Sequence, residues 1–477
     1  MFRWFKNHPV VFLTSLYLLI RVGSFFTWGD ILAQSIVSLA AIIFFIYFCA
    51  TNIEIARDIL IGEILLDGAG HFFEFQTLIL RTWFLGIFAI VWLFKKIRRR
   101  DIILPKKNIL FGMIVFGVFL FLAIVIGFVN HHSPMLIAQD AMLYLFLLLV
   151  FPALDISKIF NGLYLNFIKA LIWGSVIFSA ITLFMYSSNL YILNNAYYHW
   201  FRNIASGKIT DLGEHFFRVV LPEHIIFVPL ILIFSALLMK DIRQKYLWAM
   251  LIGALMVLSI NFTRIYFLSI GVGLIFLLYK QNFRRWIMVS SAVVAGILIL
   301  FCSFNFMASR GNSFGLDLLG IKMSGIRSMA SDPSGAIRLA LLPDIFRSIK
   351  KSPWLGSGLG TTVTYTDPLT SQVMTRSQFD WGYLEMIAEL GIIGTIVYLI
   401  FLMSILSNLF FRLAESNDKQ SLYLGLIAGA IALFVVNITT PALFQGFGVI
   451  YFVFMIAMIN DVSSRSLPEH SRILEPL

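Results

Sequence analysis

The sequence predicts an all-α polytopic membrane protein with about 12–14 transmembrane helices and one large loop on the outer side of the membrane. Of its 477 residues, 59% are hydrophobic and 13% are charged, whereas an ordinary soluble domain carries roughly 25% charged residues. Apolar runs of about 20 residues, the length that spans a bilayer, recur from one end of the chain to the other. A transmembrane β-barrel would instead show alternating segments of about 10 residues.

Candidate spans follow one another with mostly short connections. We place them at about 10–28, 31–50, 77–94, 109–129, 137–154, 166–186, 223–240, 246–262, 265–280, 286–304, 382–409, 421–439 and 443–460. The opening run follows basic residues but shows no small-residue cleavage site, so we interpret it as an uncleaved first helix. Cys49 and Cys302 both lie within apolar runs, so no disulfide framework is expected.

Short basic loops predict which side of the membrane faces the cytoplasm. With these spans, the basic clusters from residue 77 onward all fall on one side. They are Lys95, Lys96, Arg98, Arg99, Arg100, Lys106 and Lys107; Lys240, Arg243 and Lys245; Lys280, Arg284 and Arg285; and Arg412 and Lys419. Because these loops explain most of the net charge of +11, we expect contact with membrane lipids and no nucleic-acid partner.

The N-terminal part departs from this rule. Strict alternation of the spans places Arg3 and Lys6 on the outer side. An N-terminus on the inner side would require a further crossing within 51–76. That stretch is costly to insert because it contains Glu54, Arg57, Asp58, Glu63 and Asp67. We therefore interpret 53–67 as an amphipathic helix in the membrane interface.

The chain divides into four regions. Residues 1–304 are predicted to form transmembrane helices with short loops and an outer segment near 187–222. Residues 305–380 form the large outer loop, which includes an amphipathic helix at 334–351. This loop carries more basic than acidic residues, a balance that suits an anionic ligand. Residues 381–463 form the C-terminal transmembrane helices, and 464–477 form a cytoplasmic tail.

Arg264 is the only charged residue between Lys245 and Lys280. Because both lysines are predicted to face the cytoplasm, the chain between them must cross outward and return as two helices of about 16 residues. Arg264 then lies at the outer tip of a tight hairpin. It either extends to lipid phosphate or has a function at the outer face, and we favour a function. Arg218, just before the 223–240 span, is an outer arginine of the same kind.

Arg338 lies in the stretch SGAIRLALLPDIFRSIKK, which spans 334–351. At 100° per residue, the apolar side chains of this stretch cover one continuous arc, and Arg338 falls near its middle. A charge on the buried face of a helix needs a partner or a ligand. The alternatives are a structural salt bridge and the binding of a ligand anion, and we favour the anion.

Three carboxylates occur in the stretch SQFDWGYLEMIAELGIIG, which leads the chain back into the membrane. Asp380 at its outer end is either a helix N-cap or a catalytic carboxylate. Glu385 and Glu389 lie at an i, i+4 spacing on one helix face. They either pair with arginines or line a cavity.

Two weaker patterns carry less information. The glycine-rich turn SPWLGSGLGTT at 352–362 follows a helix rather than a strand, so the context of a nucleotide-binding loop is missing. At most, its backbone amides lie near a ligand. The histidines show no convincing metal-ligand spacing, and we expect neither a metal nor another cofactor.

Four local patterns, in this order and spacing, resemble the O-antigen ligase and polysaccharide polymerase superfamily of bacterial membrane glycosyltransferases. FTRIYFLS resembles its SR hairpin, and SGAIRLALLPDIFRSIKKSPWLGSGLG resembles its arginine followed by a helix and a P-x-x-G-x-G-x-G turn. DWGYLEMIAELGIIG resembles its H-N-x-Y-L-x-x-x-x-E-x-G-x-x-G segment. The 305–380 loop corresponds in position to its large periplasmic loop. The resemblance covers about 215–460 well and the first half only by hydropathy.

The resemblance implies an enzyme of the bacterial inner membrane. It would transfer an oligosaccharide from undecaprenyl pyrophosphate to a glycan or lipid-linked glycan acceptor at the periplasmic face. Arg264 and Arg338 match the positions that hold the pyrophosphate, and with Asp380 they are the predicted catalytic residues. The predicted substrate-binding residues are Arg218, Arg264, Arg338, Tyr383 and Glu389.

The chain departs from the family pattern at Asp380, where the pattern has a histidine, and at Trp381, where it has an asparagine. A carboxylate can also accept the proton of an acceptor hydroxyl. If the histidine is indispensable to ligation, its replacement points to a polymerase or a divergent relative. We favour a polymerase of O-antigen or exopolysaccharide repeat units, with an O-antigen ligase that acts on lipid A-core as the alternative.

Two further classes of protein compete with this interpretation. One is a polysaccharide flippase or transporter, although the internal repeats common in transporters are not visible. The other is a peptidoglycan glycosyltransferase of the cell-elongation type, whose usual motifs do not appear in the sequence.

Overall fold

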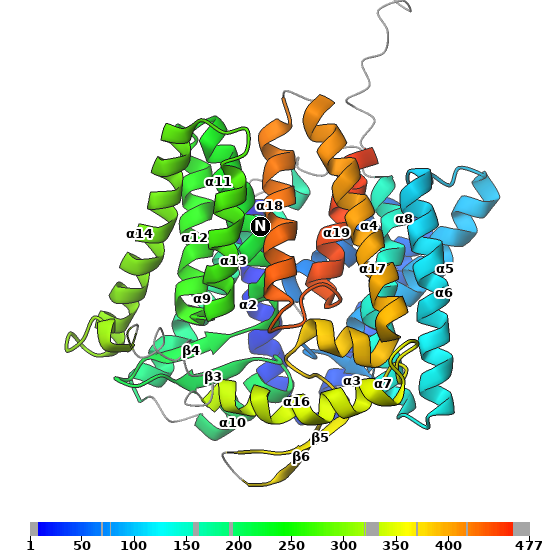
Figure 1. Cartoon of the computed structure of the whole chain (residues 1–477), viewed down its shortest axis with the longest axis horizontal. Coiled ribbons are helices and arrows are strands. Elements are labelled where there is room, and N and C mark those ends of the chain that lie inside the picture. The colour runs from blue at the N-terminus through cyan, green and yellow to red at the C-terminus, as the bar shows by residue number, and fades with distance from the viewer. Residues whose placement is uncertain are drawn as a thin grey trace, which may run out of the picture.

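The structure, a computed structural model, describes residues 8–67, 70–76, 78–155, 162–189, 194–318, 320, 333–368, 371–415 and 418–460. The predicted fold class is confirmed, because the described chain is a bundle of membrane-length helices with short two-stranded hairpins (Figure 1). Eight helices in the described ranges are long and apolar enough to cross a membrane, and four shorter apolar helices accompany them. Arg3, Lys6, the 321–332 part of the large loop and the 464–477 tail lie outside the described residues.

The first half of the chain is helical apart from a short hairpin. Its elements are α2 (Pro9–Thr27), α3 (Ile31–Thr51), α4 (Ile53–Asp67), β1 (Glu74–Phe75), β2 (Leu78–Ile79), α5 (Leu80–Arg99), α6 (Lys107–Val129), α7 (Pro134–Leu145), η1 (Phe146–Leu149), α8 (Val150–Leu154) and α9 (Leu163–Ser187). Asp30 begins α3 as an N-cap, since its carboxylate accepts hydrogen bonds from the N–H groups of Leu32 and Ala33.

The second half adds the remaining membrane helices and two further hairpins. Its elements are α10 (Asn194–Asn203), β3 (Lys208–Asp211), β4 (Phe217–Val220), η3 (Pro222–Ile226), α11 (Phe227–Lys240), α12 (Lys245–Asn261), α13 (Arg264–Leu277), α14 (Phe283–Ala308), α16 (Pro333–Lys351), β5 (Val363–Thr366), β6 (Val373–Arg376), α17 (Gly382–Glu415), α18 (Gln420–Val436) and α19 (Gly446–Asn460). The predicted hairpin of two short helices around Arg264 is confirmed as α12 and α13.

Helix α11 forms the centre of the bundle and packs against α12, α13 and α18. Nearly all of its side chains are buried, whereas α3, α6 and α14 expose many of their apolar side chains. Apolar side chains exposed along a whole helix are stable in hydrocarbon rather than in water. The difference therefore identifies α3, α6 and α14 as lipid-facing helices and α11 as an internal one.

The two ends of the bundle differ in character. One end, the hairpin end, carries the antiparallel pairs β3–β4 and β5–β6, with α10 and α16 beside them (Figure 1). The other end, the basic end, carries the clusters around Lys95, Lys240 and Lys280. There, Lys95 donates hydrogen bonds to the carbonyls of Cys49 and Ala50 at the end of α3.

The interpretation of 53–67 as an interfacial helix is wrong. Helix α4 starts beside the end of α3 at the basic end and packs against α3, α5 and α9. It ends near Arg21, which donates a hydrogen bond to the carbonyl of Leu66. Eight of its residues are buried, including Asp67, so it does not present one polar face to water. It is an additional crossing of the bundle.

Ion pairs explain how α4 tolerates its charges. Arg57 pairs with Asp58 at 3.1 Å, and Asp58 also accepts a hydrogen bond from Tyr164. Near the other end, Arg81 lies 3.6 Å from Glu63 and 3.5 Å from Asp67. Paired charges inside a bundle cost far less than isolated charges in lipid. Hydropathy alone could not find this crossing, because Arg81, the partner of Glu63 and Asp67, lies on another helix.

The added crossing places the start of α2 toward the basic end and predicts a cytoplasmic N-terminus. In a variant with Cys49→Ser and Cys302→Ser, we expect a cysteine at Asn312 to react with an impermeant thiol reagent in intact cells. Cysteines at His8 and Asp101 should react only after the membrane is opened. All three side chains are exposed in the structure, so each is accessible to the reagent from its own side. Reaction of His8→Cys in intact cells would contradict α4 as a crossing.

Candidate functional site

The candidate site lies at the hairpin end, where four segments meet below the membrane helices (Figure 1). These segments are the β3–β4 hairpin, the start of α13, the helix α16 and the stretch that leads into α17. They carry four of the six residues that the sequence predicts to act on substrate: Arg218, Arg264, Arg338 and Asp380.

Arg264 is the first residue of α13, directly after the turn that ends α12. Phe262 makes this turn with a left-handed backbone, at φ 45°, and its ring stacks on Phe301 with 4.2 Å between the ring centroids. Thr263 is the N-cap residue of α13. The guanidinium group therefore projects from a helix start at the hairpin end, as the sequence predicts.

Tyr266 shows that two further arginines lie at this helix start. It follows Arg264 by two residues, is buried, and interacts electrostatically with both Arg218 and Arg338. Arg218 comes from β4, where it pairs with Thr210 of β3. Arg338 comes from α16. The structure thus brings arginines that lie far apart in the sequence within electrostatic range of one tyrosine.

Helix α16 buries part of its predicted apolar face. Leu341 and Ile345, which lie one and two turns after Arg338, are fully buried and pack in one cluster with Val363 and Phe379. The carbonyl of Arg338 accepts a 3.1 Å hydrogen bond from the Trp381 indole. Among the described residues, the buried Nε of Arg338 has no hydrogen-bond partner. A buried guanidinium nitrogen that lacks a protein partner is suited to a ligand oxygen.

Asp380 lies just before α17 with a left-handed backbone, at φ 57°, a conformation that aspartate adopts more readily than most residues. Its carboxylate is 3.6 Å from the guanidinium of Arg376, which stands over the ring of Tyr365 at 5.4 Å. Burial raises the pKa of Tyr365. The hydroxyl of Tyr365 has no hydrogen-bond partner within the described part of the chain.

The N-cap alternative for Asp380 does not fit the geometry. The carbonyl of Trp381 accepts the first hydrogen bond of α17, from the N–H of Glu385, so Trp381 occupies the N-cap position. The carboxylate of Glu385 accepts a 3.0 Å hydrogen bond from the N–H of Phe379. Asp380 thus lies outside the helix and directs its carboxylate to Arg376.

Further cations surround this carboxylate. The pKa of Lys208 on β3 is lowered, mainly because the protein around its ammonium group displaces water and also because Arg202, Arg376 and Arg218 lie near it. The carboxylate of Asp380 has the opposite effect and raises the pKa of Lys208. The side chain of Lys208 is partly solvent-exposed, so water and salt weaken these interactions. Asp380 therefore lies in a basic environment at the protein surface.

Tyr383 and Glu389 are placed differently from the arginines. The hydroxyl of Tyr383 donates a 2.8 Å hydrogen bond to the carbonyl of Phe434 on α18. Glu389 is buried and shares a hydrogen bond with Asp140 of α7. Both predicted substrate contacts are thus engaged inside the bundle, an arrangement that favours structural roles.

The glycine-rich turn fastens α16 to the membrane helices. Its amides donate to protein acceptors rather than to an open site: Ser357 to the Ala388 carbonyl, Gly358 to the Glu389 carbonyl, Leu359 to the Ala123 carbonyl and Gly360 to the Asp140 carboxylate. Helix α17 is broken at Gly391, and the turn satisfies carbonyls on one side of the break. In return, the N–H groups of Ile392 and Ile393 donate to the carbonyls of Pro353 and Trp354.

We expect Gly358→Ala to destabilise this junction. Gly358 has φ 89°, and an added Cβ would lie 2.2 Å from the backbone nitrogen of Gly127. The left-handed backbone alone costs about 1–2 kcal/mol in a residue with a side chain, and the contact with α6 backbone adds to it. Thermal unfolding of the purified protein measures the loss. Gly117→Ala in the same α6 helix, where a Cβ meets nothing within 4 Å, is the control. Equal melting temperatures in the two variants would contradict the assigned role of the turn.

Several residues of this site were not predicted from the sequence. Arg376, Lys208, Tyr365 and Tyr266 enter it through the two strand hairpins and the start of α13. The i, i+4 spacing of Arg376 and Asp380 was the one available signal. No group of three or more histidine, cysteine, aspartate or glutamate residues in the described ranges could hold a metal ion.

Comparison with known families supports the resemblance seen in the sequence. Residues 247–399 match the family model described as O-Antigen ligase. The match begins in α12, contains Arg264, Arg338 and Asp380, and ends in α17. This segment is therefore similar to the O-antigen ligase-like superfamily, whose members act on lipid-linked glycans and glycan acceptors. No curated protein matches the chain.

Proposed function

We propose that this chain is an O-antigen ligase-like membrane enzyme, which transfers an oligosaccharide from undecaprenyl pyrophosphate to a sugar hydroxyl at the periplasmic face of the inner membrane. Polymerisation of O-antigen or exopolysaccharide repeat units is the favoured reaction. The observation that carries this proposal is the group of arginines at the hairpin end. Arg218 and Arg338 both act on Tyr266 beside Arg264, and the Nε of Arg338 has no partner among the described residues.

The arginines would act on the pyrophosphate. Planar guanidinium groups bind phosphate oxygens through paired charge-assisted hydrogen bonds. When the bond between the anomeric carbon and the pyrophosphate oxygen breaks, negative charge develops on the leaving group. Fixed cations at that point stabilise the transition state more than the ground state. Arg264 and Arg338 are the proposed pair, with Arg218 as a third cation.

Asp380 would act on the acceptor. The acceptor oxygen forms a new bond to the anomeric carbon, and its proton passes to the carboxylate of Asp380. The position of Asp380 outside α17, between Arg376 and the basic β3–β4 hairpin, supports a role at the surface where an acceptor glycan arrives. Asp380 replaces the histidine of the family pattern, and for this reason we favour the polymerase over the ligase that acts on lipid A-core.

Purified protein in lipid nanodiscs, supplied with an undecaprenyl-pyrophosphate-linked oligosaccharide, tests the proposal. Lengthening of the lipid-linked glycan supports a polymerase, and transfer to lipid A-core supports a ligase. The same protein in sealed vesicles tests the rival class. Movement of the intact lipid-linked glycan across the membrane without any new glycosidic bond would show that the protein is a flippase and not a glycosyltransferase.

Substitutions at Asp380 test the proposed base. Asp380→Asn keeps the size of the side chain but cannot accept a proton, so we expect transfer to fall by roughly 10²-fold or more with unchanged folding. Asp380→His restores the residue of the family pattern and should retain part of the activity. Rates of transfer at saturating donor measure both effects. Full activity of Asp380→Asn would end the catalytic assignment.

A further inference from the structure

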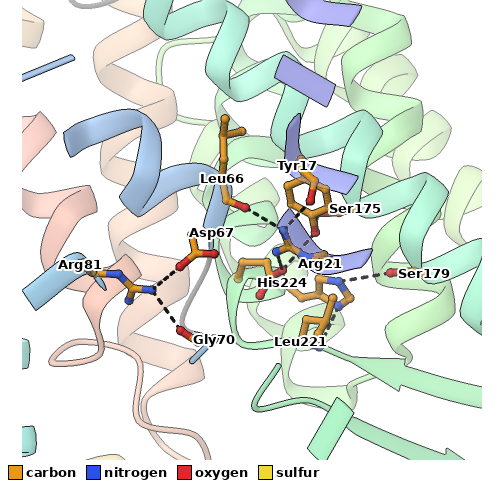
Figure 2. A network of polar contacts seen from close by, with 11 residues as sticks. Tyr17, Arg21, Leu66, Asp67, Gly70, Arg81, Ser175, Ser179, Leu221 and His224 are labelled. Carbon is orange, nitrogen blue, oxygen red and sulfur yellow. Dashed lines mark hydrogen bonds and ion pairs between the residues drawn. The ribbon is translucent and has the colours of Figure 1, made fainter. Parts of the chain in front are cut away.

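A buried polar network links α2 to the segments that carry two of the site arginines. Figure 2 shows Tyr17 and Arg21 on α2 beside His224 on η3, with Asp67 and Arg81 at one edge of the network. Arg21, Glu223, His224 and Asn261 are each at most 1% exposed. The match to the O-antigen ligase model begins at residue 247, so most of this network lies outside it.

The first part of the network holds the segment that follows Arg218. Glu223 comes shortly after Arg218, at the end of the β3–β4 hairpin, and accepts hydrogen bonds from Arg21 at 2.7 Å and from Tyr17 at 3.1 Å. Arg21 also donates to the carbonyls of Tyr17 and Leu66. Its guanidinium lies over the Tyr17 ring at 3.4 Å. The strand that carries Arg218 is therefore tied to α2 at a fixed point.

The second part of the network holds the turn that carries Arg264. The amide nitrogen of Asn261 lies 2.9 Å from Nδ1 of His224, and the amide oxygen of Asn261 accepts a hydrogen bond from the hydroxyl of Thr263. These contacts assign an acceptor role to Nδ1, so the ring proton is on Nε2, which faces Ser179 at 3.5 Å. Thr263 precedes Arg264, so the orientation of the Asn261 amide governs the start of α13.

His224 is the point where the two parts meet. His224 directly follows Glu223 in the sequence. The ion pair between Glu223 and Arg21 therefore also fixes the position of the His224 imidazole, which contacts Asn261. Arg218 and Arg264 thus extend from one buried framework. Such a framework is not explained by stability alone, because a buried ion pair confers little net stability over apolar residues of the same shape. Buried polar networks are suited to hold side chains in a fixed geometry.

We propose that Asn261 and His224 are positioning residues that set the orientation of Arg264 relative to Arg218. This inference rests on the proposed function, because it assumes that Arg264 holds the donor pyrophosphate. Asn261 and His224 are buried below the turn and act only through Thr263 and the start of α13. A displacement of Arg264 by about 1 Å would be enough to reduce turnover strongly.

The test combines Asn261→Leu with a substitution of Arg264. Leucine has a similar size but cannot bond Thr263 or His224, so transfer should fall by about tenfold to a hundredfold. In an Arg264→Lys background, Asn261→Leu should change transfer by less than about twofold. The effects of the two substitutions are not additive when Asn261 acts through Arg264. The rise in melting temperature on binding undecaprenyl pyrophosphate gives the same comparison without turnover. It is measured in the unaltered protein, the two single variants and the double variant.

Conservative variants separate positioning from a general structural effect. His224→Asn places an amide oxygen near the position of Nδ1 and should keep most of the transfer rate, whereas His224→Leu should lose it as Asn261→Leu does. Ser259→Ala is the matched control, since it removes another buried polar side chain of α12, whose hydroxyl contacts the carbonyl of Ile297. Its transfer rate should equal that of the unaltered protein.

Two results would overturn the inference in different ways. If Asn261→Leu lowers transfer and pyrophosphate binding by the same factor with and without Arg264→Lys, Asn261 does not act through Arg264. If the unaltered protein shows neither transfer nor a thermal shift with undecaprenyl pyrophosphate, the proposed function fails and the inference fails with it. If the unaltered protein shows transfer and a thermal shift, and Asn261→Leu shows the same values, the inference is rejected while the proposed function stands.

Discussion

Replacement of Arg338 by alanine should abolish most glycan transfer while the protein remains folded. Removal of one fixed group that stabilises a developing negative charge reduces turnover by about 10²–10³-fold. The buried Nε of Arg338 has no partner in the described part of the chain, so its loss breaks no hydrogen bond of this nitrogen. Arg338→Lys keeps the charge but not the paired geometry, and its rate should lie between those of alanine and arginine.

Arg347 on the same helix provides the control for this result. Its side chain is 70% exposed and pairs with Asp344, so Arg347→Ala should leave transfer unchanged. Rates at saturating donor and the melting temperature are measured for both variants. If Arg338→Ala keeps its rate, or loses it only together with its melting transition, Arg338 is a structural residue.

Replacement of Arg21 by methionine should give the largest loss of stability. Arg21 and Glu223 are fully or almost fully buried and lie 2.7 Å apart. Removal of one partner leaves an uncompensated buried charge, which costs about 3–5 kcal/mol. Thermal unfolding in one detergent measures the effect. Arg347→Met, which breaks the exposed pair with Asp344, should cost less than about 1 kcal/mol.

The double variant Arg21→Met with Glu223→Gln tests the cause of this loss. Glutamine removes the charge of Glu223 but still accepts the hydrogen bond of Tyr17. Because no unpaired charge remains, the double variant should be more stable than Arg21→Met alone. A double variant that is less stable than either single variant would show that the lost contacts, rather than the buried charge, determine the stability.

Local patterns were sufficient for the parts of the site that depend on local geometry. Arg264 lies in a helical hairpin because the stretch between Lys245 and Lys280 is long enough only for the two short helices α12 and α13. The apolar arc of α16 follows from helical periodicity, and its centre is buried as predicted. Both predictions use residues that are close in the sequence.

Contacts between distant segments could not be predicted in this way. The β3–β4 and β5–β6 hairpins, which bring Lys208 and Arg376 to Asp380, have strands of four residues that leave almost no periodic signal. The glycine turn reads as a loop, although its amides complete the broken helix α17. Arg21 was visible as a charge within an apolar span, the same signal that identified Arg264, but its partner Glu223 is about two hundred residues away.

The charged crossing α4 makes the order of membrane integration differ from the order of synthesis. When α4 leaves the ribosome, Arg81 of α5 and Tyr164 of α9 have not yet been made. At that stage Asp58 has only Arg57 of α4 itself as a partner. Glu63 and Asp67 lack Arg81, the cation with which they pair. Each unpaired central charge is unfavourable in lipid by about 2.5–3.5 kcal/mol. The translocon must therefore retain α4 until α5, and then α9, can enter the bilayer with it. We therefore expect the N-terminal helices to enter the bilayer as a group, so that the direction of the chain in the membrane is decided only when that group is complete.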